Sequence, residues 1–187
     1  MFLLDTSNGV TQSDLRQQKD FAKRMAQQFG VAPSSSHAAV LSYSDKPRLI
    51  GGFFDYLMGK SFKDIVDSVT LTGGRRNIQQ ALQQTQRLLT SARPKVPYVV
   101  FLITYGQQAR ELGSQRLREM AQSVRDIPAV LYIIGVGVDD NDPQLQPVVE
   151  RRGDFFEIPS SGELNSYVQP IAYYVVSRTG KSIAILR

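Results

Sequence analysis

The stretch Pro97-Tyr98-Val99-Val100-Phe101-Leu102-Ile103-Thr104-Tyr105-Gly106 contains the most hydrophobic segment of this 187-residue chain. An apolar run of this length that opens into a turn is typical of a β-strand buried on both faces. We therefore expect a central strand that ends at Thr104, with Tyr105-Gly106 directly beyond its carboxyl end.

Three other apolar runs also open into turns, at Phe2–Asp5, Ala38–Tyr43 and Val130–Gly135. Between the runs, apolar residues recur at helical spacing. The four stripes are Leu15, Ala22, Met25, Ala26 and Phe29; Ile78, Leu82, Leu88 and Leu89; Leu117, Met120, Ala121, Val124 and Ile127; and Leu164, Val168, Ile171 and Val175. Alternation of strand and helix predicts an α/β fold with a doubly wound, mostly parallel central sheet flanked by helices on both faces.

In a doubly wound sheet, ligands bind beyond the carboxyl ends of the strands, where the winding direction switches. Asp5 and Tyr105 both follow such strand ends. These two positions are therefore the first place to look for a functional site.

Length and composition indicate one domain with a real core, since 42% of the residues are hydrophobic. We expect a domain at residues 1–178 and a C-terminal extension or linker at 179–187. Met1 leads straight into the first predicted strand, so we expect a module of a longer protein. The lack of cysteine excludes disulfides, thiol catalysis and thiolate-bound zinc. No apolar stretch approaches the roughly 20 residues that span a bilayer, so we expect no membrane insertion.

Motifs of catalysis and nucleotide binding are missing. Gly135-Val136-Gly137 lacks the rest of a dinucleotide fingerprint, and Gly73-Gly74-Arg75-Arg76 lacks the Gly-Lys-Ser/Thr of a phosphate-binding loop. The sequence has no Gly-x-Ser-x-Gly, zinc-site or paired-carboxylate pattern either. We therefore expect no enzyme, no catalytic residue and no cofactor.

Taken in order and spacing, several segments resemble the von Willebrand factor A domains of matrix proteins, collagen VI-type chains, matrilins and integrin inserts. The segments are Phe2–Gly9, Ala39–Ser44, Gly73–Leu82, Val99–Gly106, Ile133–Gly137 and Glu163–Val168. The resemblance extends from Phe2 to about Arg178. It implies a Rossmann-like fold and a secreted module of cell adhesion or protein binding in the extracellular matrix.

Adhesive members of this family bind a divalent ion, which captures an acidic residue of the partner. Their ligands come from an Asp-x-Ser-x-Ser loop, a threonine on a second loop and an aspartate on a third. In this sequence Asp5 and Ser7 match the first loop, but Gly9 replaces its second serine. The threonine position falls on Arg76, or on Asn77 if the alignment shifts by one residue, and the aspartate position falls on Tyr105.

These replacements predict a degenerate metal-ion-dependent adhesion site. Gly9 has no side-chain oxygen, a guanidinium only donates hydrogen bonds, and a phenol is neutral near pH 7. We expect weak or absent Mg²⁺ and Ca²⁺ binding, with Arg76 paired to Asp5 in place of the ion. Another interpretation makes Asp5 and Ser7 a polar turn that caps the first helix, with Thr11 or Ser13 as other possible caps.

Two further polar features have structural interpretations. Asp139-Asp140-Asn141-Asp142 is followed by Pro143, which fits a helix N-cap at Asp142 better than a weak calcium site, because the Gly and distal Glu of an EF-hand loop are missing. The single histidine, His37, has no second histidine or obvious carboxylate partner, so we expect a surface residue.

Aromatic and basic residues are candidates for a partner surface. The aromatic groups are Phe53-Phe54 with Tyr56, and Tyr173-Tyr174, and we expect packing as their main role. An exposed loop is the alternative for Phe53 to Tyr56, because they follow Gly51-Gly52 in a stretch without clear periodicity. Arg75 and Arg110 belong to a net charge of +5 that is scattered along the chain.

The resemblance implies as partner a matrix protein such as collagen, or another chain with this domain, bound without a bridging metal. One alternative is an intracellular scaffold module of a multiprotein complex. The other is electrostatic binding of sulfated glycan or nucleic acid by the basic residues, of which nucleic acid is disfavoured because no recognition motif is present.

Overall fold

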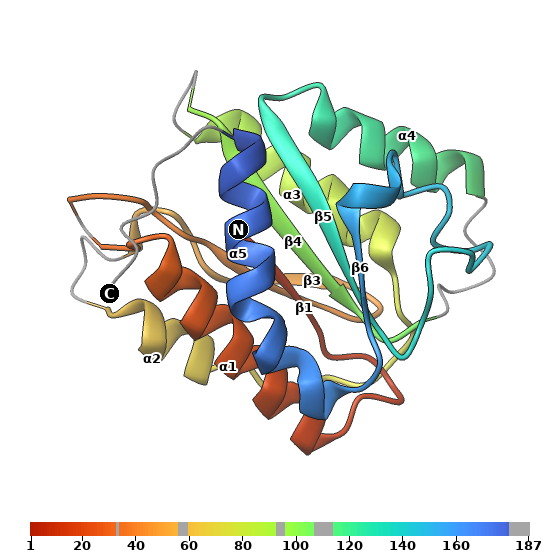
Figure 1. Ribbon diagram of the computed structural model, residues 1–187, viewed down its shortest axis with the longest axis horizontal. Helices are drawn as coiled ribbons and strands as arrows, with labels where there is room; N and C mark the ends of the chain where they lie inside the picture. The colour runs from red at the N-terminus through yellow and green to blue at the C-terminus, as the bar shows by residue number, and fades with distance from the viewer. Residues whose placement is uncertain (33, 56–59, 93–95, 107–113, 180–187) are drawn as a thin grey trace.

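The computed structural model describes residues 1–32, 34–55, 60–92, 96–106 and 114–179. A six-stranded sheet with strand order β3-β2-β1-β4-β5-β6 forms its centre (Figure 1). The strands are β1 Phe2–Asp5, β2 Val40–Tyr43, β3 Pro47–Gly51, β4 Tyr98–Thr104, β5 Ala129–Val136 and β6 Phe155–Ile158. Neighbouring strands are parallel except β2 and β3, which confirms the predicted mostly parallel sheet.

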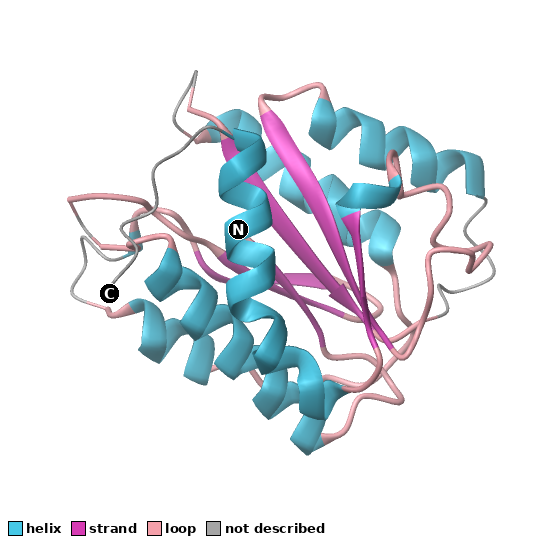
Figure 2. Ribbon diagram, viewed as in Figure 1, coloured by secondary structure: helices cyan, strands magenta, loops and turns pink. Residues whose placement is uncertain are grey.

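Helices cover both faces of the sheet (Figure 2). The α-helices are α1 Gln12–Gln28, α2 Phe62–Asp67, α3 Ile78–Ser91, α4 Ser114–Arg125 and α5 Val168–Thr179, with 3-10 helices η2 Arg152–Asp154 and η3 Ser161–Tyr167. One core cluster joins the sheet to α1, α2 and α5, and a second joins it to α3 and α4. The doubly wound architecture is thus confirmed.

Strand residues alternate between these two cores. In β1, Phe2 and Leu4 pack toward α1 and α5, while Leu3 between them packs toward α3. Phe101 of β4 lies at the centre of the first core, with its ring stacked on Phe2 at a centroid distance of 5.4 Å. Burial of each such side chain contributes about 1.5–3 kcal/mol, so the continuous apolar runs stabilise a sheet covered on both sides.

The winding direction changes between β1 and β4. Strand β1 pairs with β2 on one side and with β4 on the other, although β4 comes much later in the chain. The carboxyl ends of these strands carry Asp5 and, one residue beyond β4, Tyr105. The fold therefore brings the two residues to the topological switch point that the sequence predicted.

Some elements differ from the sequence-based expectation. Strands β3 and β6 and the short helix α2 were not predicted. The helix expected after Asp142 is wrong, since residues 143–148 form turns. Asp142 Oδ1 instead accepts a hydrogen bond from Gln144 N at 2.8 Å, as in a capped turn. Pro147 lacks an amide hydrogen and would clash with the carbonyl four residues earlier, which excludes a continuing helix.

No helix within the described residues combines the length and the apolar character needed to cross a membrane. Of the extension expected at residues 179–187, Thr179 is the last residue of α5, and residues 180–187 lie outside the described residues.

The amino group of Met1 is buried at the start of β1. It donates a hydrogen bond to Val99 O at 2.7 Å, and Phe101 N donates to Met1 O at 2.9 Å. Burial lowers the pKa of this amino group from 8.0 to about 5. Between these two values the unfolded chain binds a proton that the folded chain does not, so acidification favours unfolding.

For the 187-residue chain prepared with a free amino group at Met1, we predict that the free energy of unfolding falls by up to about 4 kcal/mol as the pH drops from 8 to 5, because each pKa unit corresponds to 1.36 kcal/mol. Urea denaturation across this range measures the slope. The Nα-acetylated chain is the control and should lack this contribution. Identical slopes in the free and acetylated chains would contradict the prediction.

Candidate functional site

Asp5 is the central residue of the site. Its side chain is fully buried at the end of β1. The buried side chain of Gln18 on α1 clamps the Asp5 backbone from both sides, since Asp5 N donates to Gln18 Oε1 at 2.8 Å and Gln18 Nε2 donates to Asp5 O at 2.9 Å. The carboxylate is therefore held in one position by the strand and the helix together.

The two carboxylate oxygens of Asp5 have different partners. Oδ1 accepts hydrogen bonds from Ser7 N at 3.0 Å and from Ser7 Oγ at 2.6 Å. Oδ2 accepts a hydrogen bond from Arg76 Nε, in an ion pair whose arginine side chain is only 10% exposed. The expected contact between Arg76 and Asp5 is thus present, and it neutralises a carboxylate that has no access to water.

A glycine pair positions the loop that carries Arg76. Gly73 and Gly74 both have positive φ, at 67° and 84°. A Cβ on Gly74 would lie 2.1 Å from Asp45 Oδ2, so only glycine allows this approach. Asn8 ties the loop to the first loop, because Asn8 N donates to Gly74 O at 2.8 Å and Gly74 N donates to Asn8 Oδ1 at 3.1 Å.

The alternative alignment with Asn77 at the site is excluded by geometry. Asn77 is the N-cap of α3, and its Oδ1 accepts a hydrogen bond from Gln80 N at 3.0 Å. Likewise, Asp5 and Ser7 do not cap α1. Thr11 is the N-cap and forms a capping box with Asp14, so one of the two other caps considered from the sequence is confirmed.

Tyr105 lies beside this pair at the end of β4. Its hydroxyl donates to Asp14 O at 3.4 Å, and its ring packs against the α1 and α5 side of the core. Burial, together with the charges of Asp14 and Asp5, raises the pKa of Tyr105 above its ordinary value. The residue at the third-loop position is therefore a neutral phenol directed at α1.

Gly9 completes the predicted set. It is exposed, has a φ of 90°, and offers no side-chain oxygen. Within the described residues, no group of three His, Cys, Asp or Glu side chains is placed to hold a metal ion. A guanidinium on Asp5, a phenol and a glycine do not match the oxygen ligands that Mg²⁺ and Ca²⁺ require.

Sequence reasoning missed a set of hydroxyl groups beneath the two loops. Thr72 Oγ1 lies 2.8 Å from Thr6 Oγ1 and donates to Ser44 Oγ at 2.9 Å. Tyr43 is fully buried, and its hydroxyl donates to Ile103 O at 2.7 Å. Burial, with the charge of Asp5 as the next cause, raises the pKa of Tyr43 well above its ordinary value. In the sequence, these hydroxyl groups are indicated only by polar residues at the ends of predicted strands.

The predicted partner residues are spread over two edges of the sheet. Arg75 is exposed at the edge that carries Asp5 and lies 3.4 Å from Asp45. Phe53 and Phe54 lie at the opposite edge. The ring of Phe53 packs on Tyr98 at 5.6 Å, which agrees with the expected packing role and not with the alternative of an exposed loop. Phe53 lines an apolar pocket of about 330 Å³. Phe54 is 44% exposed.

The remaining predicted residues are His37, Tyr56, Arg110 and the pair Tyr173-Tyr174. The ring of His37, expected at the surface, is half-buried and meets Phe54 edge-on at 6.0 Å. Tyr56 and Arg110 lie outside the described residues. The expected packing of the tyrosine pair is confirmed for Tyr174, which packs on Phe156. It is wrong for Tyr173, which is 75% exposed.

Removing the arginine should be costly because it leaves the Asp5 carboxylate buried without a cation. We predict that Arg76→Ala lowers the free energy of unfolding by about 3–5 kcal/mol. The double variant Asp5→Asn with Arg76→Met removes both charges and should lose much less. Urea denaturation of both variants measures the difference, and a loss below about 1 kcal/mol in Arg76→Ala would show that the pair contributes little.

Comparison with known proteins identifies the family. Cuticlin-6 of Caenorhabditis elegans is 26% identical over 166 residues, which are 88% of this chain and 28% of that protein. The collagen alpha-4(VI) chain of Mus musculus is 29% identical over 154 residues, or 81% of this chain and 6% of that one. The chain thus spans less than a third of either relative. Both are extracellular matrix proteins.

A solved structure has the same fold. Proximal thread matrix protein 1 from the mussel byssus superposes with a TM-score of 0.82 at 16% sequence identity, over 93% of this chain and 46% of that chain. A second structure of that protein is described as having a zinc-occupied MIDAS motif. Finally, the von Willebrand factor type A domain family matches residues 1–170, and the chain therefore belongs to this family.

Proposed function

We propose that this chain is a non-enzymatic protein-binding module of a secreted extracellular matrix protein, which binds its partner without a bridging metal ion. The proposed partner is a matrix protein such as collagen, or another chain that contains this domain. The observation that carries the proposal is the contact of Arg76 with Asp5, which places a cationic side chain on the carboxylate expected to hold an ion.

Charge explains how the site works without an ion. A divalent cation would bring two positive charges to Asp5, and the arginine already supplies one through a hydrogen-bonded contact. An incoming cation would have to displace a guanidinium whose side chain is nine-tenths buried. Because Gly9 and Tyr105 contribute no replacement oxygen at their family positions, the displaced state has too few ligands to compensate.

The relatives favour a matrix role over an intracellular scaffold, since they include a collagen VI chain and a cuticlin. The chain covers only a small share of either protein. What this domain offers a partner is the surface around the site. Arg75 is an exposed charged group of this surface, and its pair with Asp45 is weak enough to be exchanged for a partner's carboxylate.

We predict that Mg²⁺, Mn²⁺ and Ca²⁺ at millimolar concentration leave the melting temperature of the chain unchanged. The variant Gly9→Ser/Arg76→Thr/Tyr105→Asp restores the family's oxygen ligands. Its melting temperature should rise by about 5 °C or more at saturating ion, because an ion that binds only the folded state stabilises it. Differential scanning calorimetry measures both.

The matched control is Gly9→Ser/Tyr105→Asp, which regains two ligands but keeps Arg76. It should remain insensitive to ions, because the guanidinium still occupies Asp5. A specific rise in melting temperature for the unmodified chain would contradict metal-free function. A response of the control equal to that of the triple variant would show that Arg76 does not block the site.

The partner surface can be located with two single variants. We predict that Arg75→Ala weakens binding to immobilised collagen by about fivefold, equivalent to roughly 1 kcal/mol, and that EDTA has no effect. Phe54→Ala, at the opposite edge, should bind within twofold of the unmodified chain. Surface plasmon resonance measures both affinities, and the reverse order would move the proposed contact to the aromatic edge.

A further inference from the structure

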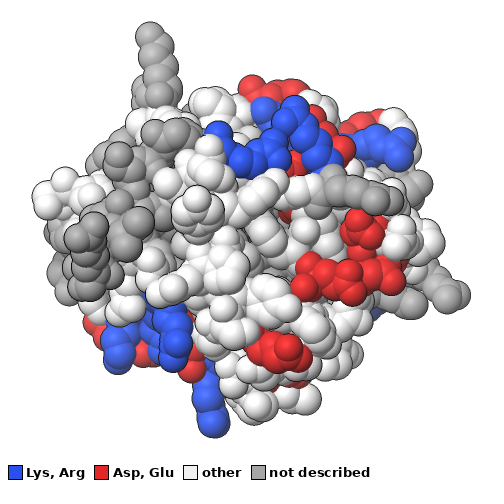
Figure 3. Space-filling view, viewed as in Figure 1, with Lys and Arg blue, Asp and Glu red and all other residues white. Residues whose placement is uncertain are grey.

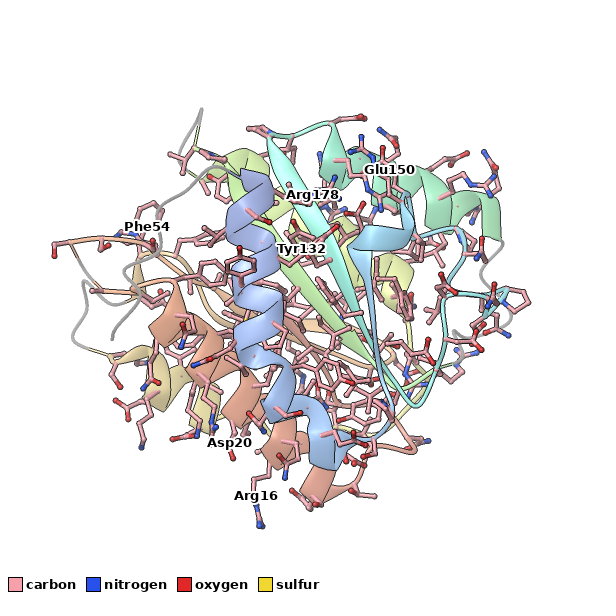
Figure 4. The ribbon with its side chains drawn as sticks, in the orientation of Figure 1. Arg16, Asp20, Phe54, Tyr132, Glu150 and Arg178 are labelled. Atoms are coloured by element: carbon pink, nitrogen blue, oxygen red, sulfur yellow. The ribbon has the colours of Figure 1, made fainter. Side chains whose placement is uncertain are left out.

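A polar pocket lies at the edge of the sheet opposite to Asp5, near the amino ends of β5 and β6. Its volume is about 380 Å³, within the range of small-molecule sites. The end of α4, the start of β5, the residues before β6 and the end of α5 surround it, and they contribute Arg125, Tyr132, Glu150, Arg151, Asp154 and Arg178. Figure 4 shows Tyr132, Glu150 and Arg178 in this part of the molecule.

Two buried polar atoms among the lining residues have no hydrogen-bond partner in the protein. They are Tyr132 Oη and Asp154 Oδ1. Tyr132 is fully buried and Asp154 is 4% exposed. Each such atom costs about 1–3 kcal/mol of stability relative to a satisfied one. Native proteins seldom retain this cost, so we expect a bound water or a ligand to satisfy the two atoms.

The surroundings hold both groups in place. The ring of Tyr132 stacks on Phe101 at 5.9 Å and meets Tyr174 edge-on at 6.2 Å. At Gly153 a Cβ would lie 2.1 Å from the Tyr174 hydroxyl, so the backbone before Asp154 fits closely under that ring. Burial raises the pKa of Asp154, and the nearby Arg178 and Arg125 oppose this effect.

Arginine side chains form the rim. Arg178 Nη1 lies 3.9 Å from Asp154 Oδ1 and donates to the Tyr174 hydroxyl at 2.8 Å. Arg125 is engaged by Glu150 at 3.1 Å and by Val148 O. Arg151 is exposed. In Figure 3 blue atoms gather near the top of the view, where Figure 4 labels Arg178 and Glu150.

We propose that this pocket binds an acidic sugar unit of a glycan. A sugar hydroxyl can donate to Asp154 Oδ1 and accept from Tyr132 Oη, which satisfies both atoms with one kind of group. A sulfate or carboxylate on the same sugar pairs with Arg178 and Arg151 at the rim. An acidic side chain fits less well, because its carboxylate has no hydrogen to donate to Asp154, whereas a sugar carries hydroxyl groups next to its anionic group.

The site is separate from the edge assigned to protein binding and does not depend on that assignment. It also differs from a diffuse basic surface, because the proposed binding requires Tyr132 Oη and Asp154 Oδ1 at defined positions. The binding test therefore needs variants of the arginine residues at the rim and of the buried Tyr132.

Isothermal titration of the intact chain with a heparin hexasaccharide and a hyaluronan hexasaccharide tests the proposal and separates a sulfate from a carboxylate as the anionic group. We expect at least one of them to bind. Arg178→Gln should weaken binding by about tenfold or more, equivalent to about 1.4 kcal/mol. The control Arg16→Gln changes an exposed arginine on α1 at the far end of the molecule in Figure 4, and should stay within twofold.

The role of the buried Tyr132 hydroxyl in sugar binding is tested by Tyr132→Phe, which removes only that hydroxyl. We expect about a tenfold loss of affinity with an unchanged or higher melting temperature, because no partner in the protein is lost. A lower melting temperature with unchanged affinity would assign the hydroxyl to the fold and overturn the proposal. Failure of both oligosaccharides to bind would overturn it as well.

Two other outcomes would also contradict the proposal. An equal loss in Arg16→Gln and Arg178→Gln would indicate diffuse electrostatic attraction. A hexaglutamate peptide that binds as tightly as the better oligosaccharide would replace the sugar by an acidic protein segment.

Discussion

The buried carboxylate of Asp5 needs a compensating positive charge, and this requirement determines how the loops beyond the carboxyl end of β1 are arranged. An ionised carboxylate without water or a cation is strongly destabilising. Here the guanidinium of Arg76 meets it from the second loop, while Ser7 donates twice from the first. The clamp of Gln18, the positive φ of Gly73 and Gly74, and the contacts of Asn8 all serve to bring these groups together. In the metal-free site that we propose, Arg76 supplies the positive charge that compensates the Asp5 carboxylate.

Much of the fold could be predicted because its signals are long. The runs in β1, β4 and β5 are continuous and apolar, and the stripes of α1 and α3 keep helical spacing over several turns. Elements of four to six residues, such as β6 and α2, are too short to carry a period. The helix predicted after Asp142 is absent because Pro147 would interrupt it, and this signal is present in the sequence.

The part of the candidate site that lies at the carboxyl ends of strands could be predicted from the sequence. Asp5, Ser7, Arg76 and Tyr105 could be expected to converge, since β1 and β4 are adjacent at the switch point. Gln18 could have been noticed as a polar residue on an apolar helical face, between Leu15 and Phe21. The pocket shared by Tyr132 and Asp154 could not have been predicted. The two residues are far apart in the sequence, and only the pairing of β5 with β6 brings them together. Phe53 and Arg75 were both candidates for one partner surface, and only the fold separates them onto opposite edges of the sheet.

The most direct test of the central claim is a crystal structure of the chain grown in Mn²⁺, with an anomalous difference map calculated around Asp5. We expect no peak at that position and the Arg76 guanidinium hydrogen-bonded to the Asp5 carboxylate. An anomalous peak within about 2.3 Å of an Asp5 oxygen, with Arg76 turned away, would contradict the account and assign the site to a metal ion.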